Sequence, residues 1–100
     1  MTSPFEIRLS HRASEDLLDL WLYVAESNPA AADRILDDIE RVVGLLAENP
    51  QMGRERREVM RGIRSFAAVP WVIFYRIEQS DAILVARVIH GARDLDELDF

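Results

Sequence analysis

The sequence contains no cysteine and no lysine, and each absence excludes a class of chemistry. Without cysteine the chain can form neither a disulfide framework nor a thiolate metal site, and this composition is compatible with a reducing compartment. All 12 basic residues are arginine, so no lysine can form a Schiff base or serve as a tunable base. The chain also lacks a phosphate-binding glycine loop, a metal-ligand spacing and a nucleophile with a matching base. We therefore expect no metal, no cofactor and no catalytic residue of these kinds.

Long hydrophobic runs are absent as well. No stretch approaches about 18 consecutive apolar residues, and the N-terminus has no basic start followed by an apolar region. We therefore expect neither membrane insertion nor export, and we predict a cytoplasmic protein. With 49 % hydrophobic and 30 % charged residues the composition is ordinary for a globular protein. A length of 100 residues fits one modest core, so we predict a single domain over residues 1–100.

Charge is unevenly distributed along a chain whose net charge is −6. Residues 1–53 hold 4 arginines against 10 acidic residues, residues 54–93 hold 8 against 4, and residues 94–100 hold 4 acidic residues. The basic middle segment indicates a surface that meets an acidic partner. A net negative domain is nevertheless a poor nucleic-acid binder, so we expect no direct DNA binding by this chain alone.

The first half of the sequence predicts one strand and two helices. Residues 4–9 alternate apolar and charged side chains, which is typical of a half-buried strand. Two amphipathic helices follow: Ser10 is placed to cap the first, and Asn28 with Pro29 to begin the second, which ends before Pro50. The short turn between them predicts an antiparallel helical hairpin.

The second half predicts three strands after a charged connection at residues 51–62. The strands are expected at residues 63–68, 71–77 and 82–90, and the nearly continuous apolar character of 71–77 indicates a central position. Short loops join them, so they should form an antiparallel meander. The expected fold class is α+β: a strand, an antiparallel helical hairpin and a three-stranded antiparallel meander forming one small sheet. The helices should cover one face and leave the other partly open.

An arginine inside the last predicted strand, Arg87, needs an explanation. A buried cation without a partner costs several kcal/mol, so Arg87 requires either a carboxylate or an open face. Arg64, Arg76 and Arg93 lie in or just beyond the same three strands, so we expect the four guanidinium groups to converge on one face. His90 follows the last strand beside two of them. We predict that all five contact a partner; the alternative is that each arginine pairs with a carboxylate of its own chain.

Five segments together resemble the ParE-type toxins of bacterial type II toxin-antitoxin systems. They are ASEDLLDLWLYV, NPAAADRILDDI, LAENPQMGRERREVMRGIRSF, WVIFYR and ARVIHGARDL, and they span about residue 8 to residue 95. The most specific parts are NPQMGR followed by GIRSF, and the ending RVIHGARDL. The resemblance implies a small antiparallel sheet with a helical hairpin. It also implies a short antitoxin whose C-terminal segment wraps the toxin, and DNA gyrase as the target, poisoned by protein contact rather than by an enzymatic reaction.

The RelE branch of the same superfamily shares the fold but cleaves messenger RNA on the ribosome. Its members use lysines and arginines on the sheet and a tyrosine near the C-terminus, whereas this chain has no lysine and ends in Asp99 and Phe100. Arg64 matches one of the basic positions, and Arg93 is a looser match. His90 is the natural candidate for proton transfer. An acidic domain is poorly suited to approach ribosomal RNA, so we favour gyrase inhibition. A ribosome-dependent nuclease and a non-toxic antitoxin-binding relative are the alternatives.

Overall fold

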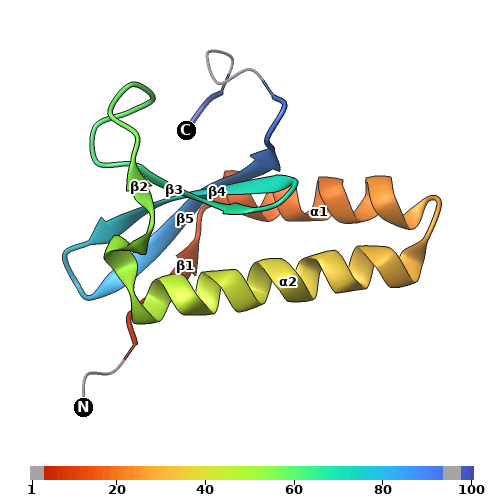
Figure 1. Cartoon of the computed structure of the whole chain (residues 1–100), viewed down its shortest axis with the longest axis horizontal. Coiled ribbons are helices and arrows are strands. Elements are labelled where there is room, and N and C mark those ends of the chain that lie inside the picture. Colours follow the sequence, from red (N-terminus) through yellow and green to blue (C-terminus); the bar gives the residue numbers. More distant parts are fainter. Residues whose placement is uncertain (1–3, 94–97) are drawn as a thin grey trace.

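The fold is a five-stranded sheet with two long helices packed against one of its faces (Figure 1). The computed structural model describes residues 4–93 and 98–100. In chain order the elements are β1 (Glu6–Leu9), α1 (His11–Ala25), α2 (Pro29–Glu48), the short 3-10 helix η1 (Pro50–Met52), β2 (Arg54–Glu55), β3 (Arg64–Ala68), β4 (Trp71–Glu78) and β5 (Ala82–His90). This arrangement confirms the predicted α+β class and the helical hairpin.

The strands lie in the order β1-β5-β4-β3-β2. β3, β4 and β5 form the predicted antiparallel meander, with β4 in the central position. β1 pairs with β5 in parallel, because the helical hairpin and the meander provide the long crossover that a parallel pair requires. The prediction contained four strands; the fifth, β2, is a two-residue strand that pairs with β3. So short a strand shows no alternation, and its sequence is therefore indistinguishable from the charged connection around it.

Both helices begin at the predicted capping residues. The Ser10 Oγ accepts a hydrogen bond from the Ala13 backbone N–H at 3.0 Å, and the Asn28 side chain accepts one from Ala31 at the same distance. Each bond satisfies one of the free N–H groups at a helix N-terminus. In the part of the chain that the structure describes, neither helix has the length and apolar character needed to cross a membrane.

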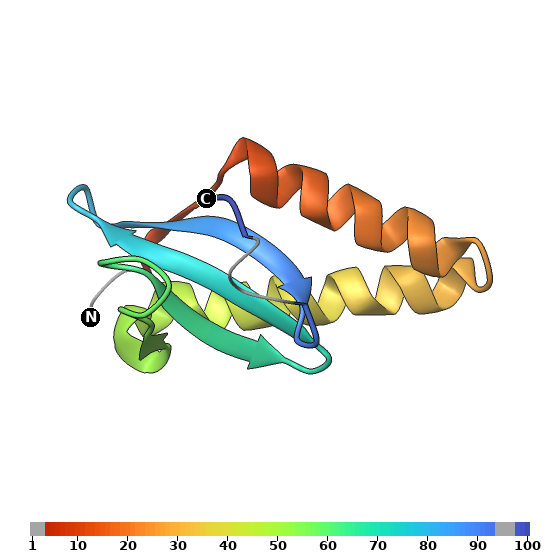
Figure 2. The ribbon, with the colours of Figure 1, turned by 90° about the horizontal axis from the view of Figure 1, so that it is seen from above.

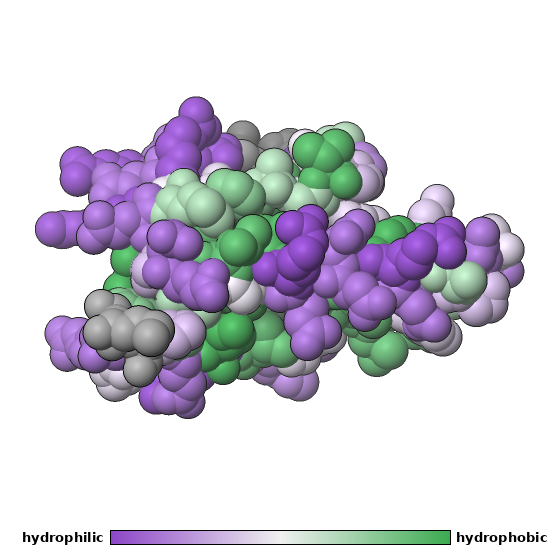
Figure 3. Space-filling view, turned by 60° about the horizontal axis from the view of Figure 1, so that its bottom comes forward, coloured by the Kyte–Doolittle hydropathy of each residue, from purple (hydrophilic) through white to green (hydrophobic). Residues whose placement is uncertain are grey.

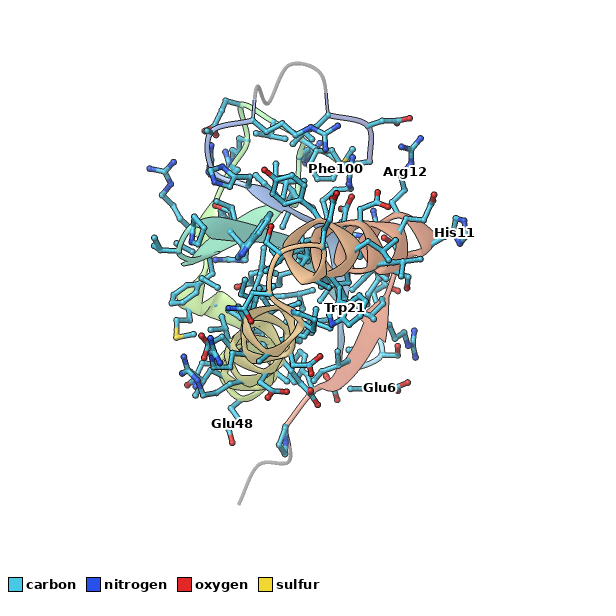
Figure 4. All side chains as sticks on the ribbon, turned by 90° about the vertical axis from the view of Figure 1, so that its right-hand side faces the viewer. Glu6, His11, Arg12, Trp21, Glu48 and Phe100 are labelled. Atoms are coloured by element: carbon cyan, nitrogen blue, oxygen red, sulfur yellow. The ribbon has the colours of Figure 1, made fainter. Side chains whose placement is uncertain are left out.

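The main core lies between the two helices and the sheet. We call this side of the sheet the helix face and the opposite side the open face. The buried residues of the main core are Ala13, Leu20, Ile39, Val42, Val43, Leu46, Ala47, Ile73, Tyr75, Ile83, Val85 and Val88. Between the helices, the Trp21 Nε1 donates a hydrogen bond of 2.9 Å to Asp33 (Figure 4). The helical hairpin is thus held both by apolar packing and by this link.

A smaller apolar cluster lies on the open face. Its buried members are Ile63, Phe74, Ala86 and Ile89, and the side chains that pack against it are Val59, Val72, Leu98 and Phe100. Figure 2 places the C-terminal end of the chain over β5, beside α1. The open face is therefore covered in part by residues from the end of the chain.

A β-bulge at Ala86 decides which face Arg87 occupies. Val85 lies opposite Tyr75 and Arg87 lies opposite Phe74, so Ala86 is an extra residue in β5. Strict alternation from Val85 would place the Arg87 side chain in the main core, on the helix face. The extra residue moves it to the open face, together with Phe74.

Candidate functional site

The five predicted contact residues do not lie on one surface. By the strand registers, Arg64 and His90 belong to the helix face and Arg76 and Arg87 to the open face, while Arg93 lies just after β5. Arg64 is in register with Tyr75, the residue before Arg76 in β4. Consecutive side chains of a strand point to opposite faces of the sheet, so Arg64 and Arg76 lie on opposite faces. The prediction that the arginines converge on one face is therefore wrong.

Arg87 is buried in an ion pair with α1. Its Nε and Nη2 donate to the two carboxylate oxygens of Asp16 at 2.7 and 2.9 Å, and the two side chains are only 5 % and 10 % exposed. This is the two-pronged geometry in which a guanidinium binds a carboxylate most strongly. The bonds to Asp16 outweigh the desolvation of the guanidinium and raise the pKa of Arg87. The carboxylate required by the sequence argument is therefore supplied by the chain itself.

The same carboxylate also completes the edge of the sheet. β1 pairs with β5 only as far as Val85; beyond it the Asp16 carboxylate accepts a hydrogen bond from the Val88 N–H at 2.9 Å. The Ser10 backbone N–H donates to the Val85 carbonyl at 2.9 Å, and the Ser10 Oγ donates to the Ala86 carbonyl at 2.8 Å. Ser10 and Asp16 thus satisfy backbone groups that an unpaired strand edge would leave free.

Arg64 is committed to the backbone of the η1–β2 segment. Its Nη1 donates to the Gly53 carbonyl at 2.7 Å, and its Nη2 lies 3.3 Å from a Glu55 carboxylate oxygen. The Tyr75 hydroxyl donates to the Pro50 carbonyl at 2.6 Å and accepts from the Gly53 N–H at 2.9 Å. Burial raises the pKa of Tyr75. The segment NPQMGR is therefore held to the sheet by Arg64 of GIRSF and by Tyr75 of WVIFYR.

These contacts explain the most specific segments of the sequence in structural terms. Asp16 was not predicted as the partner of Arg87, because the two residues are 71 positions apart. The link between Gly53 and Tyr75 was not predicted either, since they are 22 positions apart. In the sequence Asp16 differs little from the other acidic residues of α1, which also stand beside apolar residues. Its position in the helix therefore does not identify it as the partner of Arg87.

The remaining predicted residues are accessible. The Arg76 side chain is 49 % exposed and lies 3.7 Å from Glu78, while His90 and Arg93 are exposed. The His90 ring meets Trp71 edge to face at 5.4 Å, and its Nδ1 accepts a hydrogen bond from the Ala92 N–H at 3.1 Å. These three side chains are free to contact another molecule without any rearrangement of the fold.

Arg64 and His90, the two residues that a nuclease mechanism would use, lie far apart. Arg64 is in register with Tyr75 and His90 with Trp71, on strands separated by β4. Four residue rises and two strand spacings put their Cα atoms about 16 Å apart in a flat sheet. At that separation the two side chains would have to extend toward each other to meet at one phosphate, whereas the Arg64 guanidinium is bonded to the Gly53 carbonyl.

β2 and the connection that follows it carry two highly exposed arginines. Arg54 and Arg57 are 74 % and 84 % exposed and make only long ion pairs, of 3.9 Å to Glu58 and 3.5 Å to Glu55. Pairs with this exposure and separation contribute little to stability. Their charge remains available to an acidic partner, as the charge distribution of the sequence indicated.

Two apolar grooves flank helix α2. The α2–β3 groove, ≈ 340 Å³, lies between α2 and the β3–β4 hairpin and is lined by Ile35, Asp38, Ile39, Arg41, Val42, Leu45 and residues 66–71. The α2–β1 groove, ≈ 380 Å³, is lined by Ile7, Leu9, Leu17, Leu36, Ile39, Glu40 and Val43. Figure 3 shows hydrophobic residues on both sides of the polar outer surface of α2. Exposed apolar surface of this kind is typical of sites that bind another protein or a ligand.

The described residues include no group of three or more His, Asp or Glu side chains placed to hold a metal ion. The described residues form two apolar grooves, expose several basic side chains and leave part of the outer edge of β3 unpaired. β2 pairs with β3 only at Arg64 and Ser65. Residues 66–68 pair with β4 on one side, but on the side that borders the α2–β3 groove no strand of the described part of the chain pairs with them. These are features of a protein-binding surface.

Comparison with known proteins identifies relatives of this architecture. The family described as ParE toxin of type II toxin-antitoxin system, parDE, matches residues 7–95. Toxin ParE3 of Caulobacter vibrioides is 32 % identical over 83 residues, covering 82 % of each chain. Toxin RelE3 of the same organism is 35 % identical over 86 residues, covering 85 % of this chain and 92 % of the relative. The solved chromosomal ParDE system from P. aeruginosa contains a chain with a TM-score of 0.71 at 21 % identity, covering 86 % of this chain and 95 % of that one.

Proposed function

Because this chain belongs to the family of ParE toxins of type II toxin-antitoxin systems, we propose that it poisons DNA gyrase by protein contact and that a cognate antitoxin neutralises it. The family membership makes it a toxin component. The target and the antitoxin contacts are the proposed parts.

The observation that carries the choice of target is the separation of Arg64 and His90. Cleavage of RNA requires a base, an acid and a cation around one phosphate. Here the two candidates lie about 16 Å apart by strand geometry, and the Arg64 guanidinium already donates to the Gly53 carbonyl. A toxin that acts by occupying a surface of its target needs no such cluster. The geometry therefore supports inhibition by binding over RNA cleavage.

The first experiment compares the two targets directly. Purified toxin is added to a gyrase supercoiling reaction and, separately, to translating ribosomes with a defined message. We expect loss of supercoiling, accumulation of cleaved DNA and an intact message, with the effect on gyrase abolished by the antitoxin encoded beside the toxin. Intact gyrase activity at high toxin excess, together with a cut message, would favour the nuclease. Full growth of cells expressing the toxin alone would favour the non-toxic relative.

The nuclease alternative is kept because relatives carry both ParE and RelE names at similar identity. It makes a residue-level statement that separates it from gyrase inhibition. If the chain is a nuclease, His90→Ala should abolish message cleavage while antitoxin binding survives. If it is a gyrase inhibitor, His90→Ala should lower toxicity only through any contact that the exposed ring makes with gyrase, and no cleavage should appear in either protein.

We place the antitoxin on the α2–β3 groove. An extended segment there could add a strand at residues 66–68 and seat apolar side chains against α2, a common mode of peptide binding. Leu45 is 39 % exposed within this groove, so Leu45→Asp should weaken the complex by at least tenfold. Leu22→Asp is the matched control, because Leu22 is 54 % exposed on α1 and lies outside the residues that line this groove.

We also propose that His90 and the four arginines predicted from the sequence as contact residues contribute to binding of the antitoxin or the target. Arg76, His90 and Arg93 are accessible for direct contact, whereas Arg64 and Arg87 would act mainly by shaping the surface. Charge reversal in Arg76→Glu should therefore weaken a complex more than Arg34→Glu, since Arg34 is an exposed residue of α2. Equal effects in an affinity titration would remove Arg76 from the site.

A further inference from the structure

The open face of the sheet is occupied by the segment Leu98–Phe100. The Phe100 ring meets the Phe74 ring edge to face, with centroids 5.5 Å apart and planes at 76°. Leu98 and Phe100 both pack against the buried cluster that contains Ile63 and Ile89. The segment thus covers apolar surface that would otherwise face water.

Two arginines hold this segment by its central residue. The Arg87 Nη1 donates to the backbone carbonyl of Asp99 at 2.7 Å, and the Arg12 Nη2 donates to the Asp99 carboxylate at 2.6 Å. Figure 4 shows Phe100 and Arg12 on the same side of the molecule, above α1. Arg87 is itself held in place by Asp16. The Arg87 guanidinium is therefore positioned by the fold and not by the segment.

A third arginine lies beside the same site. The Arg56 guanidinium lies 5.7 Å from the centre of the Phe74 ring, and the Arg56 side chain is 16 % exposed. Its Nη1 donates to the Ser65 hydroxyl at 3.0 Å. The Phe74 ring is thus in contact with both Phe100 and Arg56.

We propose that this surface is a peptide-binding site that Leu98–Phe100 fills from within the same chain, and that it accepts from a partner protein a segment with an acidic residue flanked by large apolar ones. The chemistry of the partner is read from the occupant: a leucine and a phenylalanine on the Phe74 cluster, and between them an acidic side chain and a carbonyl on Arg12 and Arg87.

The present occupant is suited to displacement. It consists of three residues, and the ion pair between Arg12 and Asp99 joins side chains that are 50 % and 72 % exposed, so this pair contributes little. The segment Leu98–Phe100 competes with a partner peptide mainly because it is part of the same chain. A short connection gives such a segment an effective concentration of about 1 mM or more at the site. A partner that presents the same groups with additional contacts can therefore replace it. This inference does not depend on the identity of the toxin's target.

The test uses the full chain and a synthetic peptide of residues 92–100, ARDLDELDF. The occupant is weakened by the double variant Asp99→Ala, Phe100→Ala, which leaves the sheet side of the site unchanged. Peptide is titrated into isotope-labelled protein, and backbone amide shifts are followed by NMR. We expect binding to the variant with shifts at Phe74 and at residues 86–89, and at least tenfold weaker binding to the unchanged chain, because the tethered segment competes.

Three controls keep the outcome interpretable. The variant Glu48→Ala, Val69→Ala alters one exposed acidic and one exposed apolar residue away from this site and should behave as the unchanged chain. A peptide carrying alanine in place of its last two residues should not bind. If the double variant loses spectral dispersion, Asp99→Ala alone removes only the exposed pair with Arg12 and should give a smaller gain in affinity.

Equal affinity for both proteins, shifts confined to the helix face, or no shift with peptide in the millimolar range would overturn the proposal. So would a concentration-dependent dimer of the unchanged chain that Phe100→Ala abolishes, because the site would then take its segment from a second copy.

Discussion

Replacing Asp16 by alanine should cost more stability than any other exchange of a single acidic residue in the described part of the protein. The variant leaves the Arg87 guanidinium, whose side chain is 5 % exposed, without its carboxylate, and it also frees the Val88 N–H. Removing one partner of a buried ion pair typically costs about 3 to 5 kcal/mol. Domains of this size have a total stability of about 5 to 15 kcal/mol. The loss is therefore a large fraction of the whole.

Urea unfolding followed by circular dichroism measures this loss, and a fall in Tm of roughly 15 to 25 °C should accompany it. The matched control is Glu6→Ala, because the Glu6–Arg8 pair is 63 % and 47 % exposed and should cost about 0 to 1 kcal/mol. The double variant Asp16→Ala, Arg87→Met should be more stable than Asp16→Ala alone, since no charge is then left buried. A loss below about 1 kcal/mol for Asp16→Ala would refute the reasoning.

Three further predictions concern the close approach at Gly53, the buried hydroxyl of Tyr75 and the helix cap at Ser10. A Cβ on Gly53 would lie 2.6 Å from Tyr75 Cε1 and closer to its hydroxyl, so Gly53→Ala should cost about 1 to 3 kcal/mol; Gly44→Ala, with open space around the new methyl group, should instead gain about 0.5 to 1 kcal/mol. Burial raises the pKa of Tyr75 above its usual 10.0, so the folded state keeps a proton that the unfolded state loses, and stability should fall as pH rises through about 10; Tyr75→Phe should remove this slope in urea titrations between pH 8 and 11. Ser10→Ala removes a helix cap and the bond to the Ala86 carbonyl, and thermal unfolding should show a loss of about 1 to 2 kcal/mol.

Local patterns were sufficient for the two helices, for the four longer strands and for their order along the chain. Ser10, Asn28 and Pro29 mark helix starts through bonds to residues three positions away, so the relevant physics lies within one helical turn. The strands of the meander are short runs of mainly apolar residues joined by short loops, which leaves an antiparallel arrangement as the simple solution. β2 was missed because two residues cannot show a period, and the direction of β1 depends on contacts with β5 on the far side of the chain.

The sequence predicted residues of the candidate site but not how they are arranged in space. The sequence showed that Arg87 needs a carboxylate or an open face, and it identified the basic residues near the strand ends. It could not show that the bulge at Ala86 shifts Arg87 to the open face, since a bulge leaves no reliable trace in the alternation of a nearly continuous apolar run. The predicted convergence of the arginines failed because the register places Arg64 and Arg76 on opposite faces and because Arg64 is bonded to the segment around Gly53.

By itself, the sequence determined an α+β domain with a helical hairpin, its capping residues, a chain rich in arginine and free of cysteine, and a resemblance to ParE toxins. Only the tertiary structure decided which charges remain available. Asp16 and Arg87 neutralise each other across 71 positions, and Asp99 joins Arg12 across 87. Such pairs form because a buried or crowded charge takes whatever counter-charge the packing brings near it, and sequence separation carries no information about that distance.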